Sequence, residues 1–196
     1  MGLTLLMGAH AQAERGGGKG KWTTSLYGGF SFPTPRFVDG SGSVQGYPGV
    51  TFGFGVEAQV MSAVGVQMNV LYANKGYELQ DANLTRYPAS YLTIPVELNF
   101  SPTEFVNLHF GPYLASLVMS AEKFGGGKIL PASGMFATDF GLTCGLWLGF
   151  RATNKLKIGL DMRYDFGLAD IQHDGFPEDK LYTRTFSSLM TFGFNF

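Results

Sequence analysis

The sequence predicts an all-β fold, an eight-stranded antiparallel up-and-down transmembrane β-barrel. Three observations lead to this prediction. Eight segments alternate apolar and polar residues with a period of two, and the connections between them are alternately short and long. In addition, no apolar run approaches the ~20 residues of a membrane-spanning helix, although only 15% of the 196 residues are charged. A chain this poor in charge needs an apolar environment that strands can reach.

The eight predicted strands are each about 11 to 14 residues long. This exceeds the ~5–6 residues usual in soluble sheets and suits the ~9–11 that a tilted strand needs to cross a bilayer. The strands span residues 22–32, 49–60, 64–74, 89–100, 106–118, 138–150, 155–168 and 184–196. Short turns lie at 61–63, 101–105 and 151–154, and long loops lie at 33–48, 75–88, 119–137 and 169–183. Outer-membrane barrels have this layout, with short turns in the periplasm and long loops outside.

The alternation places the charges of these strands on one face. In residues 155–168, Leu156 and Leu160 lie on one face, and Asp161 and Arg163 lie on the other. A lipocalin-like soluble barrel would show the same alternation with its two faces exchanged. Glycine favours the membrane barrel, because small residues suit the concave inner side of a narrow barrel. Glycines share the charged face at positions 53, 55, 65, 111, 141, 145, 149, 159, 167 and 193. We therefore expect the charged face to line the lumen and the apolar face to contact lipid.

Aromatic residues near the strand ends predict belts at the two membrane surfaces. The expected inner belt consists of Trp22, Phe100, Phe105, Phe150 and Phe196. The expected outer belt consists of Phe32, Tyr72, Tyr91, Phe140, Tyr164 and Phe186. Two prolines, Pro95 and Pro112, lie inside predicted strands, where proline removes a hydrogen-bond donor. Because they fall at nearly the same height, our hypothesis is that the lost donors face one another across a single gap.

The two ends of the sequence point to export and to membrane assembly. A short apolar run at residues 3–7 precedes Ala11-Gln12-Ala13, which has the A-x-A pattern of a signal-peptidase site. We therefore expect residues 1–13 to be a signal-peptide remnant and residues 14–196 to form the barrel. The last strand carries Phe192, Phe194 and Phe196 at alternate positions. Such a strand resembles the signal that the outer-membrane assembly machinery reads, so this machinery is an expected partner.

Five segments resemble an outer-membrane β-barrel family common in Bacteroidota, often called porin-like and related to the PorT-type barrels. The segments are YLTIPVEL at 91–98, FGPYL at 110–114, DFGL at 139–142, LDMRYDFGL at 160–168 and TFGFNF at 191–196. The resemblance covers most of the predicted barrel, and the order of the motifs is more specific than any one of them. It implies a β-barrel in the outer membrane of a Gram-negative bacterium. Some relatives serve type IX secretion and others have no assigned role, so it implies no single activity.

Five charged residues are expected to meet inside the barrel. Counting along the strands places them at similar depth in the periplasmic half: Glu57, Glu97, Lys157, Asp161 and Arg163. An eight-stranded barrel is just wide enough for side chains to fill it, and buried charges of both signs persist when they are paired. We therefore predict a salt-bridged, side-chain-filled lumen. A narrow porin-like channel for ions or small solutes is the alternative interpretation.

The sequence predicts no catalytic, cofactor or metal site. His109 is expected to belong to the lumen network, and His173 lies in an acidic loop. No Gly-x-Ser-x-Gly, His-Glu-x-x-His or CxxC pattern occurs, and the single Cys144 cannot form an internal disulfide. The net charge of −1 with no basic block gives no reason to expect nucleic acid. The expected function is that of a structural, accessory or surface-binding membrane protein, whose external loops bind a protein or glycan partner.

Overall fold

The structure is a computed structural model that describes residues 22–38, 44–79, 85–120, 122–123, 129–130, 138–170 and 180–196. The expected signal peptide at 1–13 and His173 lie outside the described residues. Eight long strands make up the barrel: β1 (Trp22–Pro33), β4 (Gly49–Gln59), β5 (Val64–Asn74), β8 (Ala89–Thr103), β9 (Val106–Ser120), β12 (Thr138–Arg151), β13 (Leu156–Asp170) and β14 (Lys180–Asn195). The last of these begins four residues before the predicted start at 184.

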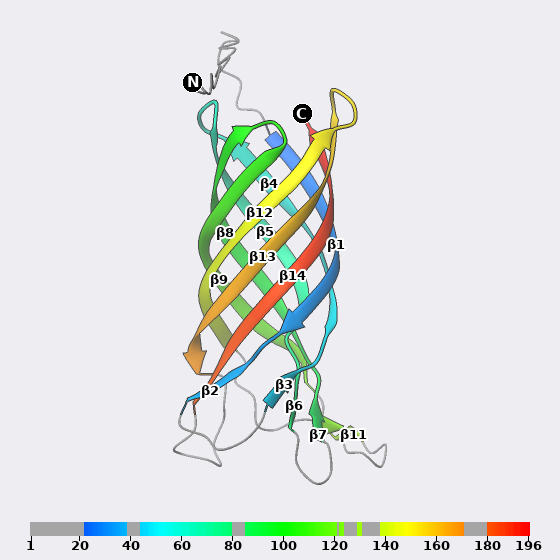
Figure 1. Cartoon of the computed structure of the whole chain (residues 1–196), viewed down its shortest axis with the longest axis vertical. Coiled ribbons are helices and arrows are strands. Elements are labelled where there is room, and N and C mark those ends of the chain that lie inside the picture. Colours follow the sequence, from blue (N-terminus) through cyan, green and yellow to red (C-terminus); the bar gives the residue numbers. More distant parts are fainter. Residues whose placement is uncertain are drawn as a thin grey trace, which may run out of the picture.

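Each long strand pairs antiparallel with its neighbour in the chain, in the order β1-β4-β5-β8-β9-β12-β13-β14. The barrel closes where β1 pairs with β14, from Thr23↔Asn195 to Pro33↔Thr185. Closure leaves no unpaired edge in the barrel wall, which a sheet needs when lipid surrounds it. The predicted eight-stranded antiparallel barrel is therefore confirmed, and its tilted strands are visible in Figure 1. Among the described residues, no helix is long and apolar enough to cross a membrane.

The two ends of the barrel differ. At one end, tight connections join β4 to β5, β8 to β9 and β12 to β13, and at this end β1 begins and β14 ends (Figure 1). At the other end, short strands continue the wall: β2 (Arg36–Val38), β3 (Val44–Gly46), β6 (Tyr77–Leu79), β7 (Thr85–Tyr87), β10 (Glu122–Lys123) and β11 (Ile129–Leu130). Five of these form a second sheet in the order β11-β10-β7-β6-β3. Since outer-membrane barrels have short periplasmic turns, this extension lies at the outer end.

The outward faces of the long strands are mainly apolar and at least partly exposed. Large apolar side chains such as Phe54, Leu98, Phe110 and Leu142 are each about half exposed along the barrel wall. The residues between them point inward and are mostly polar and buried, including Asn69, Glu97, Thr143 and Arg163. A water-facing surface of this kind would aggregate, so lipid is the solvent that suits it. The polar interior is the lumen.

The interior glycines leave room for large lumen side chains. A Cβ at Gly145 would collide with the ring of His109, and one at Gly55 would collide with the amide of Asn69. The indole of Trp147 lies against Gly149 and Gly159 in the same way, and its Nε1 donates a 2.6 Å hydrogen bond to Thr191 Oγ1. Glycine therefore appears on the polar face because the lumen is crowded.

Two of the finer expectations are wrong. Tyr91 points into the lumen with no exposed surface, so it does not belong to the outer aromatic belt. Its neighbour Leu92 faces outward, and alternation then turns Tyr91 inward to pack with Ala89 and Tyr113. Position near a strand end thus does not place an aromatic residue in a belt unless it also has the outward parity.

The two prolines interrupt different ladders. Pairing of β5 with β8 breaks between Met68↔Val96 and Leu71↔Thr93, next to Pro95. Pairing of β8 with β9 breaks between Pro95↔Tyr113 and Leu98↔Phe110, next to Pro112. The two breaks lie on opposite sides of β8, so the lost donors do not share a gap. The pairing resumes in the same register after each break.

Candidate functional site

The buried charges of the lumen form two layers, and the first lies in the periplasmic half. This inner layer contains Glu97 of β8, His109 of β9, and Asp161 and Arg163 of β13. Arg163 donates two hydrogen bonds to Asp161, from Nη2 to Oδ2 at 2.8 Å and from Nε to Oδ1 at 3.3 Å. Its Nη1 lies 3.8 Å from Glu97 Oε2. Arg163 therefore lies between two carboxylates, and its buried charge is paired with theirs.

His109 joins the same two carboxylates from β9, which lies next to β8 and two strands from β13. Its Nδ1 lies 2.7 Å from Glu97 Oε1, and its Nε2 lies 3.4 Å from Asp161 Oδ1. A protonated His109 together with Arg163 balances the two acids. Glu97 is only 1% exposed and Arg163 only 2%, so little space remains around this layer.

Amide side chains from neighbouring strands extend the inner layer by hydrogen bonds. Asn69 Nδ2 donates to Glu97 Oε2 at 2.7 Å, and Asn99 Nδ2 donates to Gln67 Oε1 at 2.7 Å. Gln67 Nε2 lies 2.7 Å from both the Tyr27 hydroxyl and Asn69 Oδ1. The network thus runs from β1 through β5 and β8 to β13. It ties opposite walls of the barrel together.

The second layer, the outer layer, consists of Lys75, Asp139 and Asp165 with the side chains that touch them. Lys75 follows the end of β5, and its Nζ lies 3.2 Å from Asp139 Oδ2 and 3.6 Å from Asp165 Oδ2. Asp139 Oδ2 also accepts hydrogen bonds from Tyr113 Oη at 3.1 Å and from Thr183 Oγ1 at 2.8 Å. The same ammonium lies 4.3 Å from the centroid of the Tyr113 ring. Lys75 is therefore enclosed by acids and an aromatic face.

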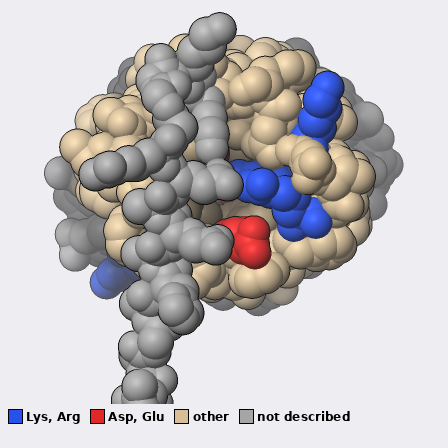
Figure 2. All heavy atoms as spheres, turned by 90° about the horizontal axis from the view of Figure 1, so that it is seen from above, with Lys and Arg blue, Asp and Glu red and all other residues tan. Residues whose placement is uncertain are grey.

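An apolar contact adjoins the inner layer, because Tyr27 also accepts the hydrogen bond from Gln67. The buried side chains of Tyr27, Leu71 and Leu189 pack together there, from β1, β5 and β14. Figure 2 looks along the barrel from the end with the tight turns; acidic and basic atoms are visible in its central opening, and further basic atoms lie at the rim. Charged and apolar side chains thus occupy the described lumen at more than one level.

The structure brings three of the five predicted lumen charges together. Glu97, Asp161 and Arg163 are in one cluster. Glu57 and Lys157 are only partly buried, and no ion pair joins them to that cluster in the part of the chain that the structure describes. Both belong to the periplasmic ends of their strands, where the lumen opens.

Sequence reasoning missed the outer layer. Lys75 lies one residue beyond the predicted strand at 64–74, so it was assigned to a loop. Asp139 and Asp165 had the inward parity but lie nearer the outer end than the predicted network. The sequence did contain one indication of this layer, because Lys75, Asp139 and Asp165 all lie toward the outer ends of their strands.

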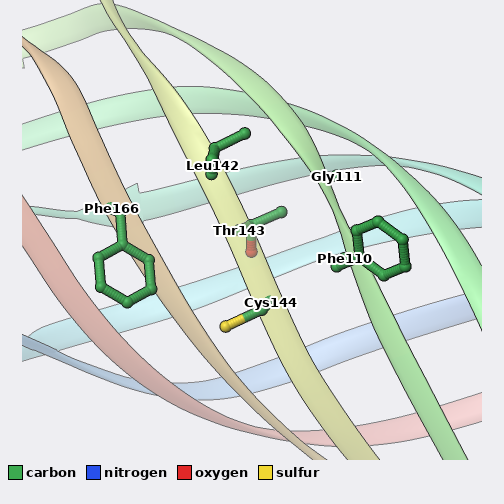
Figure 3. A pocket seen from close by; sticks show the side chains of 6 residues that line it. All are labelled: Phe110, Gly111, Leu142, Thr143, Cys144 and Phe166. Atoms are coloured by element: carbon green, nitrogen blue, oxygen red, sulfur yellow. The ribbon is translucent and has the colours of Figure 1, made fainter.

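A hollow on the outside of the barrel is not part of this site. It opens on the lipid-facing wall, and Phe110, Leu142, Cys144 and Phe166 are among its lining residues (Figure 3). Cys144 is an exposed free thiol between the larger side chains. No group of three or more His, Cys, Asp and Glu side chains suited to a metal occurs within the described ranges.

A closed barrel with a mainly apolar outer wall and buried charges in its lumen is the architecture of an integral outer-membrane protein. The chain belongs to the family described as "Outer membrane protein beta-barrel domain", whose family model matches residues 10–173. The protein is therefore located in the cell outer membrane of a Gram-negative bacterium. No curated protein matches the sequence.

Solved outer-membrane barrels have the same fold. OprG of Pseudomonas aeruginosa has a TM-score of 0.61 and 13% identity, with 89% of this chain and 95% of that chain covered. Ail of Yersinia pestis, solved with the heparin analogue sucrose octasulfate, has a TM-score of 0.51 and 15% identity, with 91% and 99% covered. Neisserial surface protein A has a TM-score of 0.51 and 11% identity, with 90% and 97% covered. At these identities the likeness concerns the fold alone.

Proposed function

We propose that this protein is a closed barrel that acts as a structural or accessory component of the outer membrane and binds a partner at its outer end. The single observation that carries the proposal is the occupied lumen. Two ion-paired layers and the Tyr27–Leu71–Leu189 contact occupy it at more than one level. A solute would have to displace paired charges from a buried site to pass.

The outer end supports a binding role. The second sheet, β11-β10-β7-β6-β3, extends the wall beyond the barrel at the end where the external loops lie (Figure 1). Loops on a rigid scaffold are the usual place for recognition. A protein, a surface glycan or a component of type IX secretion is the partner class within this proposal. The finer affiliation with Bacteroidota and PorT-type barrels is also part of it, and it is supported by the five sequence segments.

Two further parts of the proposal concern chemistry and assembly. We propose that the protein is not an enzyme, because His109 is held between two carboxylates inside the lumen rather than beside a nucleophile at a rim. We also propose that the assembly machinery recognises Phe192, Phe194 and Phe196. Phe192 and Phe194 point outward from β14, Phe196 follows its last residue, and all three side chains are exposed.

Conductance measurement tests the closed lumen. The refolded chain and an Arg163→Ala variant are inserted into planar bilayers, after heat-modifiable migration on gels has shown that both are folded. We expect no steady current from either. When Arg163 is lost, the outer layer and the Tyr27–Leu71–Leu189 contact still occupy the lumen. Steady ohmic steps from the wild type that change in Arg163→Ala would instead establish the alternative, a narrow channel for ions or small solutes.

A further inference from the structure

Two arginines lie on the lipid-facing side of the barrel near its outer end. Arg184 of β14 has the outward parity, because the next residue, Thr185, is buried toward the lumen and Phe186 is exposed. Arg36 of β2 is exposed and stands opposite Tyr182, which shares the face of Arg184. Within the side chains that the structure describes, these two arginines are the only charges on the outward face in the outer half of the barrel. Arginine on this face costs little only near the membrane surface, so we place the pair at the level of the lipid headgroups.

The two guanidinium groups are close enough to share one anion. Arg36 and Arg184 are diagonal neighbours across the ladder between β2 and β14. Directly opposed Cβ atoms in a sheet are ~4.5–5.5 Å apart and diagonal ones ~7–8 Å, a separation that two arginine side chains can span. Guanidinium groups bind phosphate through paired N–H donors, and the Tyr182 hydroxyl between them is a further donor. This corner, made of Arg36, Tyr182 and Arg184, therefore suits a phosphate group.

The hollow on the lipid-facing wall begins one strand away from this corner. Phe166 of β13 lines it and is the direct cross-strand neighbour of Arg184. The hollow holds about 200 Å³, and its accessible lining is apolar. Figure 3 shows the rings of Phe166 and Phe110 on either side of Leu142 and Cys144. Such a space accommodates part of an acyl chain rather than a polar ligand.

The line from the arginines through the hollow runs into the membrane. Arg184, Phe166 and Leu142 are matched in register across β14, β13 and β12. Paired residues lie along the perpendicular to the strands, and because the strands are tilted this perpendicular climbs toward the tight turns from β14 to β12 (Figure 1). Three strand spacings and two residues along a strand separate Arg184 from Phe110, which is roughly 16 Å. One leaflet of hydrocarbon, half of about 30 Å, has a similar thickness.

We propose that the corner and the hollow together bind one phosphorylated glycolipid of the outer leaflet. Its phosphate lies between Arg36 and Arg184, and one of its acyl chains lies in the hollow. Lipid is the solvent of this face, and anionic headgroups are what basic side chains at a membrane surface attract. The site is on the wall rather than at the outer loops or in the lumen, so it is independent of the function proposed above.

Native mass spectrometry of the refolded full-length barrel in detergent tests the site. The probe is lipid A, an acylated disaccharide phosphate, and bound lipid is counted from the mass of the complex. We expect the wild type to bind one lipid A and to bind the dephosphorylated lipid about tenfold more weakly, because the charge-assisted hydrogen bonds are lost. Inorganic phosphate at the same concentration should not compete, since it has no acyl chain. Equal binding of the two lipids overturns the proposal, and so does competition by phosphate.

Variants locate the bound lipid. The double variant Arg36→Gln/Arg184→Gln should weaken lipid A binding by about tenfold or more. Cys144→Phe places a bulky ring in the hollow and should weaken binding several-fold. Arg151→Gln is the matched control, because it removes an exposed arginine from the periplasmic end of β12, and it should bind like the wild type. Heat-modifiable migration on gels establishes that each variant is folded.

A purely structural role for the arginines predicts a different result. The ladder places Asp170 opposite Tyr182, so an acid of the chain is near the corner. If such acids pair with the arginines in place of a lipid, the double variant should unfold at a lower temperature in lipid-free detergent and bind lipid A unchanged. That result overturns the proposal. Undiminished binding by Cys144→Phe also overturns it, as does a loss in Arg151→Gln equal to that in the double variant.

Discussion

Arg163 is the residue on which the inner layer depends. It contacts Asp161 through two hydrogen bonds, faces Glu97, and its guanidinium carbon lies 5.5 Å from the centroid of the Tyr27 ring. A buried charge that loses its partner is far less stable than an intact pair. Arg163 is therefore more important for the folded barrel than its single positive charge suggests.

Arg163→Ala should lower the free energy of unfolding by about 3–5 kcal/mol, because it leaves two buried carboxylates with only His109. The measurement is urea unfolding of the barrel in lipid vesicles, followed by tryptophan fluorescence. Lys157→Ala is the control, since Lys157 lies near the periplasmic opening, and its effect should stay within about 0.5 kcal/mol. Equal losses in the two variants would show that the inner layer is not a coupled unit.

The sequence predicts which charged side chains point into the lumen, but it does not predict which of them pair with one another. Alternation alone turns Glu97, Asp161 and Arg163 inward, and they do meet. The tilt of the strands shifts equal strand positions to different heights, so counting placed Glu57 and Lys157 too deep. Lys75 was missed for the opposite reason, because it enters the lumen from beyond a strand end.

At the scale of the strand, the period of two reliably predicts which side chains point outward. It does not predict toward which neighbouring strand each backbone N–H points. Side-chain parity correctly turned the apolar residues of β12 and β13 outward. The same parity cannot say toward which neighbour a backbone N–H points, because that depends on the pairing register. The similar heights of Pro95 and Pro112 were therefore predicted correctly. The prediction that their lost donors share a single gap was wrong.

Strand β12 offers a test of depth in the membrane. Cys144 lies near its middle and Phe150 near its periplasmic end, and both side chains point to lipid. Arginine on the lipid face of a barrel costs about 2–4 kcal/mol at the bilayer midplane and about 0–1 near the interface. Cys144→Arg should therefore destabilise the barrel in vesicles by about 2–4 kcal/mol, and Phe150→Arg by no more than about 1.

Urea unfolding in vesicles measures both arginine variants. The order of the two losses is the decisive result, because lipid depth is the only property that the substitutions are designed to change. A larger loss at Phe150 than at Cys144 would contradict the placement of the hydrocarbon layer across the middle of β12.

At the scale of the whole molecule, the wall, the lumen and the outer extension have different roles. The wall is apolar and suits lipid, ion-paired side chains lie in the lumen, and the second sheet extends the wall at the outer end. The architecture was predictable because every long strand has the same alternation. The second sheet was not, because its strands are only two or three residues long and lie in segments that read as loops.

The proposed recognition of β14 by the assembly machinery predicts a difference between cells and the test tube. Phe196→Ala should reduce the amount of heat-modifiable barrel in the outer membrane several-fold, while refolding of the purified chain into detergent stays close to wild type. Phe54→Ala removes an outward aromatic side chain of β4 and should leave the cellular amount nearly unchanged. If both variants assemble normally in cells, the aromatic side chain at 196 is not a recognition element.

The seam between β1 and β14 sets the order in which this barrel folds. Every other pair of long neighbours is joined by a turn or a single loop, whereas the seam unites Thr23 with Asn195 and is fixed by the Phe196 amide, which donates to the Trp22 carbonyl at 2.9 Å. Closing a loop of nearly the entire chain carries the largest entropy cost of any contact in the molecule. The hairpins can therefore form early, but β1 remains an open edge until the last strand arrives. We therefore expect the slow step of folding to be the meeting of the first strand with the last, and a chain caught before it would present two edges that another copy could join.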